Sequence, residues 1–133
     1  MNKHILIIAV VVVVLIIVGI VIGINNHSTA MDALTAQKGE HVYVNYEGRL
    51  ANGTKFDSSY DHGAPIDFIL GAGKVIKGWD DRIVGMKIGE KKTLVIAPAD
   101  AYGSQDVTDG AGNIIIPANS TLTFNVELVK IGR

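Results

Sequence analysis

Near the end of the sequence stands TLTFNVEL, residues 121–128, in which polar and apolar side chains alternate without exception. Successive side chains of an extended strand point to opposite faces. The four apolar residues therefore share one face, and the four polar residues share the other. One packed face and one solvated face are typical of an antiparallel sheet, so this stretch predicts a β-rich domain.

Three other stretches also have strand character. Residues 41–46 alternate, with Val42, Val44 and Tyr46 on one face, and residues 66–70 alternate in the same way. Residues 91–97 are rich in strand formers and end at Pro98. Between the first two stretches, Asn52-Gly53 is a hairpin-type turn signal.

One helix interrupts the strands. Its signal is an apolar periodicity of three and four residues through Ile76, Trp79, Ile83 and Met86. Asp80 and Asp81 lie early in this segment, where negative charge suits the helix dipole. The expected fold class is therefore α+β, with a single short amphipathic helix packed on a curved antiparallel sheet.

The N-terminal segment has a different character. Residues Ile5 to Ile24 are all Ile, Leu, Val, Ala or Gly, and a helix of that length spans roughly 30 Å, the thickness of a bilayer core. We expect residues 1–24 to form a transmembrane anchor. The alternative is a cleaved signal peptide, with Ser28-Thr29-Ala30 as a cleavage site.

The basic residues around this segment predict its orientation. Lys3 precedes the apolar run, and the next basic side chain other than histidine is Lys38. The positive-inside rule then puts the N-terminus in the cytoplasm and the rest of the chain outside. If the signal peptide were cleaved, the protein would instead be secreted. Residues 25–37 are predicted to be a linker, and residues 38–133 the folded domain.

Composition excludes several classes of function. The formal net charge is −1, so no basic field points to nucleic acid. The sequence has no cysteine, and no two of its four histidines have a metal-binding spacing. The run Gly71-Ala72-Gly73-Lys74 lacks the first glycine and the final Ser or Thr of a phosphate-binding loop. We expect no metal, no cofactor and no nucleic-acid partner, and we expect a monomer.

Several short motifs remain, and taken together they resemble one family. They are Tyr46-x-Gly48, Lys55-Phe-Asp-Ser-Ser59, Val75-Ile-x-Gly-Trp79, Ala101-Tyr-Gly103 and Ile115-Ile-Pro117. In this order and spacing they resemble the FKBP family of peptidyl-prolyl cis–trans isomerases, over about residues 38–133. The resemblance implies a twisted antiparallel sheet wrapped around one short helix. It also implies an enzyme that accelerates X-Pro isomerisation during protein folding.

The resemblance further implies a set of site residues. Trp79 matches the floor of an apolar pocket for the proline ring, and Asp57 matches the polar group at its rim. The Ile76 backbone N–H and the Tyr102 hydroxyl match hydrogen-bond donors to ligand carbonyls. The catalytic set is then Phe56, Asp57, Trp79, Tyr102 and Phe124. The substrate-binding set is Tyr46, Phe56, Asp57, Val75, Ile76, Trp79, Tyr102, Ile115, Ile116 and Phe124.

Some positions depart from the family's pattern. His62 stands where arginine is frequent, which makes the partner of Asp57 weaker or dependent on pH. Ile66 replaces a frequent aromatic residue, which would widen the pocket, and Lys74 stands at the rim, where an acidic residue is common. The implied partners are unfolded or nascent polypeptides containing proline, macrolide inhibitors, and a membrane through the N-terminal helix. Two alternatives to an enzyme stay open, a binding module without turnover and an adaptor whose anchor is its main purpose.

Overall fold

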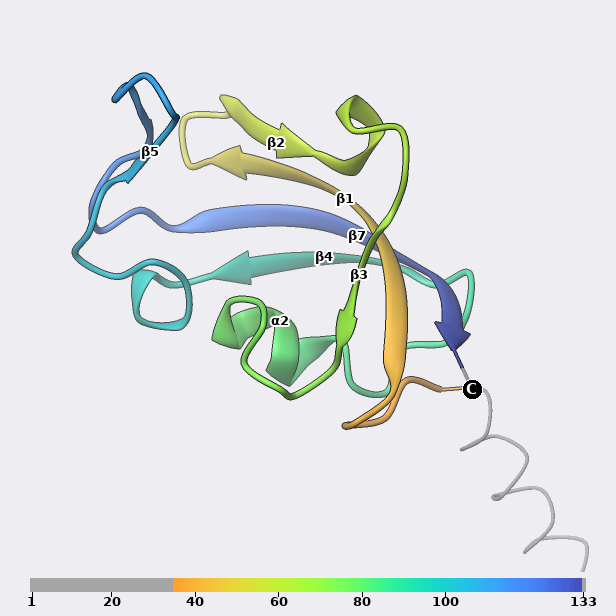
Figure 1. Ribbon diagram of the computed structural model, residues 1–133. Helices are drawn as coiled ribbons and strands as arrows, with labels where there is room; N and C mark the ends of the chain where they lie inside the picture. Colours follow the sequence, from red (N-terminus) through yellow and green to blue (C-terminus); the bar gives the residue numbers. More distant parts are fainter. Residues whose placement is uncertain (1–34, 133) are drawn as a thin grey trace, which may run out of the picture. The chain divides into compact units, whose positions relative to one another are not determined.

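The centre of the domain is the pairing of its two longest strands. A computed structural model describes residues 35–132. In it, β1 (His41–Leu50) runs antiparallel to β7 (Leu122–Gly132) over the whole length of β1 (Figure 1). The sheet order is β2-β1-β7-β4, and β3 pairs with the first half of β1. The remaining elements are β2 (Lys55–Ser58), η1 (Ser59–Asp61), β3 (Ile66–Ile69), α2 (Lys77–Arg82), β4 (Lys91–Ile96), η2 (Pro98–Asp100), β5 (Val107–Thr108) and β6 (Ile114–Ile116).

Alternation along these strands builds the core, as predicted. Val42 and Val44 of β1 are completely buried, and Tyr46 is nearly so. Every second residue of β7 from Leu122 to Leu128 is buried as well. The buried face of the sheet curves around α2, which covers it from one side (Figure 1). The predicted fold, an antiparallel sheet with one short helix, is confirmed.

The helix is shorter than its apolar periodicity predicts. α2 ends at Arg82, whereas the pattern continues to Met86. Met86 is still in the core, with 1% of its surface exposed, but a turn delivers it there. In that turn the Gly85 backbone N–H donates a hydrogen bond of 2.7 Å to the Ala36 carbonyl. After α2 the backbone forms hydrogen bonds with the first residues of the domain instead of continuing the helix. The apolar spacing continues to Met86 although the helix has ended.

The folded domain begins slightly earlier than the predicted boundary at Lys38. Ala36 is completely buried, and its backbone N–H donates to the Met86 carbonyl at 2.8 Å. Thr35 forms an isolated β-bridge with Lys87. The last three residues of the predicted linker, 35–37, thus belong to the packed domain.

The predicted anchor, residues 1–24, lies outside the described residues. Within residues 35–132, no helix has the length and apolar character needed to cross a bilayer.

Candidate active site

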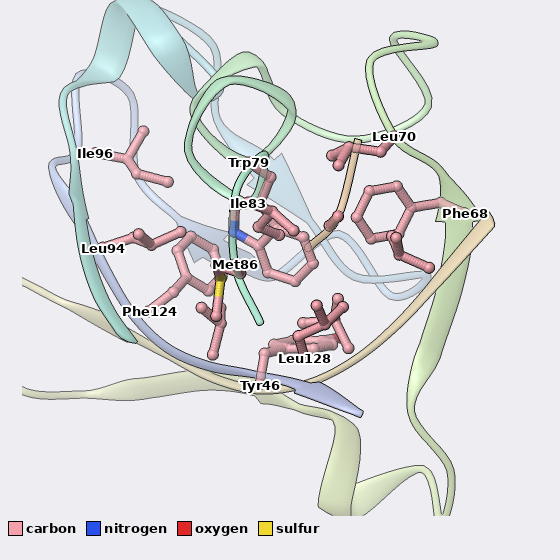
Figure 2. Close-up of a cluster of buried hydrophobic side chains, with 14 of the residues drawn as sticks. Tyr46, Phe68, Leu70, Trp79, Ile83, Met86, Leu94, Ile96, Phe124 and Leu128 are labelled. Carbon is pink, nitrogen blue, oxygen red and sulfur yellow. The ribbon is translucent and has the colours of Figure 1, made fainter. Parts of the chain in front are cut away.

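Aromatic rings from the sheet and from α2 meet at one end of the core. The Trp79 indole, on α2, contacts Tyr46 of β1 and Phe124 of β7 edge to face, with ring centroids 5.1 and 5.2 Å apart. Phe68 of β3 lies tilted against the same indole at 5.9 Å (Figure 2). Phe56 of β2 continues the cluster by standing perpendicular to Phe124 at 5.5 Å. Edge-to-face pairs add about 0.5–1.5 kcal/mol each beyond burial, so the rings hold one another in place.

This cluster does not close over itself. A cavity of about 220 Å³, which we call the Trp79 cavity, opens above it. Strands β1, β2, β3 and β7, helix α2 and two loops contribute to its walls. The lining residues are Tyr46, Phe56, Asp57, Ile66, Lys74, Val75, Ile76, Trp79, Tyr102 and Phe124.

The Trp79 side chain is the most deeply placed part of this lining. Only 4% of the Trp79 surface is exposed, and the rest of the residue is packed in the core. This is the placement expected of a side chain at the base of the cavity. Its Nε1 is the one buried side-chain nitrogen or oxygen in the described chain that lacks a hydrogen-bond partner. An unpaired buried donor costs about 1–3 kcal/mol. The fold therefore retains an indole here despite a polar penalty.

Asp57 is the negative group of the cavity, and it is tightly held. The Tyr46 hydroxyl donates to Asp57 Oδ2 at 2.5 Å, and the Ser58 backbone N–H donates to Oδ1 at 2.8 Å. His62 Nε2 also lies 2.8 Å from Oδ1. His62, which stands where the family frequently has arginine, therefore contacts the Asp57 carboxylate.

These contacts set the ionisation of the polar groups. Burial alone would raise the pKa of Asp57, but the hydrogen bonds from Tyr46, His62 and Ser58 outweigh it and lower that pKa below its ordinary value. The same burial, together with the Asp57 carboxylate, raises the pKa of Tyr46 and of Tyr102. At neutral pH the cavity therefore holds one carboxylate and two neutral phenols.

A pH dependence of stability follows from the lowered Asp57 pKa. A carboxylate with a depressed pKa in the folded state contributes stability that is present above its unfolded pKa, about 3.9, and is lost as pH falls through the folded value. We expect the free energy of unfolding of wild type to exceed that of Asp57→Asn at pH 7. The difference should shrink steadily below about pH 4. Urea unfolding of both proteins from pH 7 to pH 3 measures it, and a difference independent of pH would contradict the assignment.

Two hydrogen-bond donors at the cavity are unused. The Ile76 backbone N–H and the Tyr102 hydroxyl have no hydrogen-bond partner within residues 35–132. Ile76 directly precedes α2, and Tyr102 follows η2 with 44% of its surface exposed. Both residues line the cavity, so both donors are available to a bound molecule.

Not every predicted site residue lines the cavity. Ile116 lies in the core with 3% exposure, and Ile115 packs against that core as a partly buried side chain of β6. Neither of them belongs to the cavity lining. Conversely, Ile66 and Lys74 line it, although neither belongs to the predicted set of site residues.

The ionisable side chains that line the cavity are Tyr46, Asp57, Lys74 and Tyr102. Within residues 35–132, no three side chains of His, Asp or Glu gather where they could hold a metal ion. No serine, threonine or histidine belongs to the lining. The fold and the cavity define a small β-domain with an aromatic-lined cavity and two unpaired hydrogen-bond donors beside it.

Comparisons with known proteins specify this class further. Residues 33–129 match the family of FKBP-type peptidyl-prolyl cis-trans isomerases. The chain is 55% identical over 95 residues to FK506-binding protein 1A of Neurospora crassa, covering 71% of this chain and 75% of that protein. It is 44% identical over 95 residues to peptidyl-prolyl cis-trans isomerase Fkbp12 of Drosophila melanogaster, covering 71% and 83%. The crystal structure of AtFKBP13 superimposes with a TM-score of 0.68 at 40% identity, covering 74% and 83%.

The chain therefore belongs to the FKBP-type peptidyl-prolyl cis-trans isomerase family, and its activity is that of a peptidyl-prolyl isomerase.

Proposed function

We propose that the Trp79 cavity is the isomerase site and that it works by favouring a twisted imide bond over a planar one. The observation that carries this proposal is an aromatic cup with Trp79 at its base, open to solvent, in which apolar surface exceeds the polar surface of the rim. A proline ring is small, apolar and flat enough to lie on an indole. The amide next to it then sits at the level of Tyr102 and Asp57.

The chemistry required is rotation alone. Resonance places a barrier of about 18–20 kcal/mol on amide rotation, and X-Pro bonds exchange over about 10–100 s. At the twisted midpoint the resonance is broken, so the carbonyl oxygen carries less negative charge than in the planar amide. Water stabilises the more polar planar form. A dry aromatic cavity withholds that stabilisation, so the barrier falls without a nucleophile or a proton transfer.

The two unused donors orient the substrate in this proposal. Carbonyls flanking the imide bond accept hydrogen bonds from the Ile76 N–H and the Tyr102 hydroxyl. Holding the chain on both sides of the bond leaves the bond itself free to turn. Fixed geometry of this kind lowers a barrier by removing the entropy of alignment.

Asp57 has a positioning role and an electrostatic role. Because it accepts the Tyr46 hydroxyl, it fixes the Tyr46 ring against Trp79. Its lowered pKa keeps it ionised beside the imide carbonyl, where negative charge disfavours the polar planar state. Phe56 and Phe124 exclude water around the same group.

Tyr102 and Asp57 allow a direct test of this assignment. Tyr102→Phe removes one donor, and we expect kcat/KM for a prolyl peptide to fall about three- to tenfold, the value of a hydrogen bond worth about 0.5–1.5 kcal/mol. Asp57→Ala should lower kcat/KM by at least as much. Tyr102 is 44% exposed, so Tyr102→Phe should change the thermal unfolding midpoint little. Asp57→Ala also loses the stability that the hydrogen-bonded carboxylate contributes, so its turnover is measured at a temperature where the domain stays folded.

The matched control is Tyr60→Phe, which removes a hydroxyl from an exposed tyrosine outside the cavity. This variant should keep wild-type turnover. If Tyr102→Phe and Asp57→Ala both turned over peptide as fast as Tyr60→Phe, the site would lie elsewhere.

We further propose that the cavity binds macrolide inhibitors. The N. crassa relative carries the name FK506-binding protein, and the same aromatic cup and donors are suited to a cyclic imide-like ligand. FK506 should therefore compete with prolyl peptide, and isomerase activity that is unaffected by excess FK506 would overturn this part of the proposal.

The N-terminal segment supports a proposal on location. We propose that Ile5 to Ile24 anchors the domain at a membrane, with the domain on the extracytoplasmic side. The alternative, secretion after cleavage near Ala30, gives a chain shorter by about its first 30 residues. Alkaline extraction of membranes, followed by mass measurement of the mature chain, distinguishes the two. A full-length chain that stays in the pellet supports the anchor, and a shortened chain in the supernatant overturns it.

A further inference from the structure

One lysine stands at the Trp79 cavity with its charge unused. Lys74 lines the cavity in the turn between β3 and α2 and is exposed. Within residues 35–132 its ammonium group has no ion-pair or hydrogen-bond partner. It is the only cation among the residues that line the cavity.

The backbone that carries Lys74 is fixed from below. The Asp80 carboxylate, with 8% of the residue exposed, accepts the Gly71 N–H at 2.8 Å on one oxygen and the Gly73 N–H at 2.9 Å on the other. These bonds tie the turn to α2 on both sides of Ala72. The backbone just before Lys74 is therefore held in place by hydrogen bonds, while the Lys74 side chain is exposed to solvent.

Two neighbouring lysines are already paired, and a third, Lys38, whose side chain lies next to Gly71, does not line the cavity. Lys77 lies 2.5 Å from Asp81 and 4.0 Å from Asp100, and Lys55 lies 3.0 Å from Asp61. The one negative group in the cavity, Asp57, accepts a hydrogen bond from the Tyr46 hydroxyl and lies 2.8 Å from His62 Nε2. Once these pairs are set aside, the charge that a bound peptide meets at this wall is that of Lys74.

We propose that Lys74 makes the site selective for prolyl peptides that carry an acidic side chain next to the proline. This inference rests on the proposed function of the Trp79 cavity. A peptide lying across the cavity brings its flanking side chains to the wall above Val75. A Glu or Asp there gains an ion pair with Lys74 without disturbing any existing pair, whereas a Lys there meets a like charge.

The experiment compares peptides that differ at one position. Glu, Gln or Lys is placed directly before the proline in one series and directly after it in another. Isomerisation is followed by exchange NMR with the full-length chain in detergent, at about 10 mM salt and again at about 1 M, where the screening length falls from about 30 to about 3 Å. Wild type is compared with Lys74→Gln and Lys74→Glu. The control is Lys91→Gln, which neutralises an exposed lysine at a separate hollow on β4.

For wild type at low salt, we expect kcat/KM for the Glu peptide to exceed that for the Gln peptide about two- to fivefold in at least one series, as for an exposed ion pair. The ratio should approach one in Lys74→Gln and at high salt, and fall below one in Lys74→Glu. Lys91→Gln should keep the wild-type ratio. Equal ratios in wild type and Lys74→Gln in both series, or the same loss in Lys91→Gln, would overturn the inference.

The Gln peptide separates this inference from the function on which it rests. If wild type accelerates the Gln peptide but shows no preference for Glu, only the selectivity is wrong. If wild type accelerates no peptide, the proposed site function and the selectivity fail together.

Discussion

Trp79→Ala is expected to abolish most isomerase activity and to lower the free energy of unfolding by about 3–5 kcal/mol. The loss of stability follows from burial, since the indole is 4% exposed and contacts three other rings. The loss of activity has a separate cause, because the variant has no floor for the proline ring. If the floor supplies 1.4 kcal/mol or more of the preference for the twisted bond, kcat/KM falls about tenfold or more. Peptide turnover and urea unfolding measure the two effects.

Ile83→Ala separates these two effects. Ile83 caps the same helix, is completely buried and does not line the cavity. Its truncation should cost about 2–5 kcal/mol while leaving kcat/KM close to wild type under conditions where the domain stays folded. Trp79→Phe, which restores a smaller flat ring, should recover part of the lost turnover. Equal activity in Trp79→Ala and Ile83→Ala would mean that the indole is only a core residue.

Gly48→Ala is expected to have the second large effect, because it disturbs the wall of the cavity from behind. A β-carbon at position 48 would lie 2.5 Å from the Phe56 ring and 2.8 Å from the Phe124 ring. Both rings must shift to make room, and overpacking of this kind costs about 1–3 kcal/mol. Because the same rings line the cavity, we expect kcat/KM to fall together with the unfolding free energy.

Gly110→Ala is the matched control for this prediction. A β-carbon there has no atom within 4 Å, and the backbone does not adopt the left-handed conformation. This variant should unfold at the wild-type midpoint and turn over peptide normally. If Gly48→Ala also behaved as wild type, the close packing of Phe56 and Phe124 against β1 would be wrong.

The sequence alone predicts the strands whose two faces differ. β1 and β7 are half-buried, so their alternation is visible, and each proved longer than the alternating stretch. β2 has no such alternation. Its neighbouring residues Phe56 and Asp57 both line the cavity, and Ser58 is the one buried residue of the strand. Periodicity does not reveal β2. The signals at this place are the Asn52-Gly53 turn and the family's motif that begins at Lys55.

The sequence predicted most of the cavity lining but not all of it, because a motif does not show which way each side chain points. Motif resemblance selected the residues that line the cavity from β1, β2, α2 and β7. It could not show that Ile116 turns into the core, because a run of three isoleucines carries no alternation to mark a face. Nor could it show that Lys74 is unpaired while Lys77 is not, since that depends on which carboxylates the fold brings near.

The most direct test of the account is the rate of prolyl exchange in a peptide mixed with a small amount of the full-length chain. Bound peptide is expected to exchange on the order of 10³–10⁵ times faster than free peptide, because about 4–7 kcal/mol of preference for the twisted bond gives that factor. The Trp79 indole resonance should shift as the peptide binds. A peptide that shifts this resonance while its cis–trans exchange stays as slow as in water would contradict the claim that the cavity favours the rotated bond.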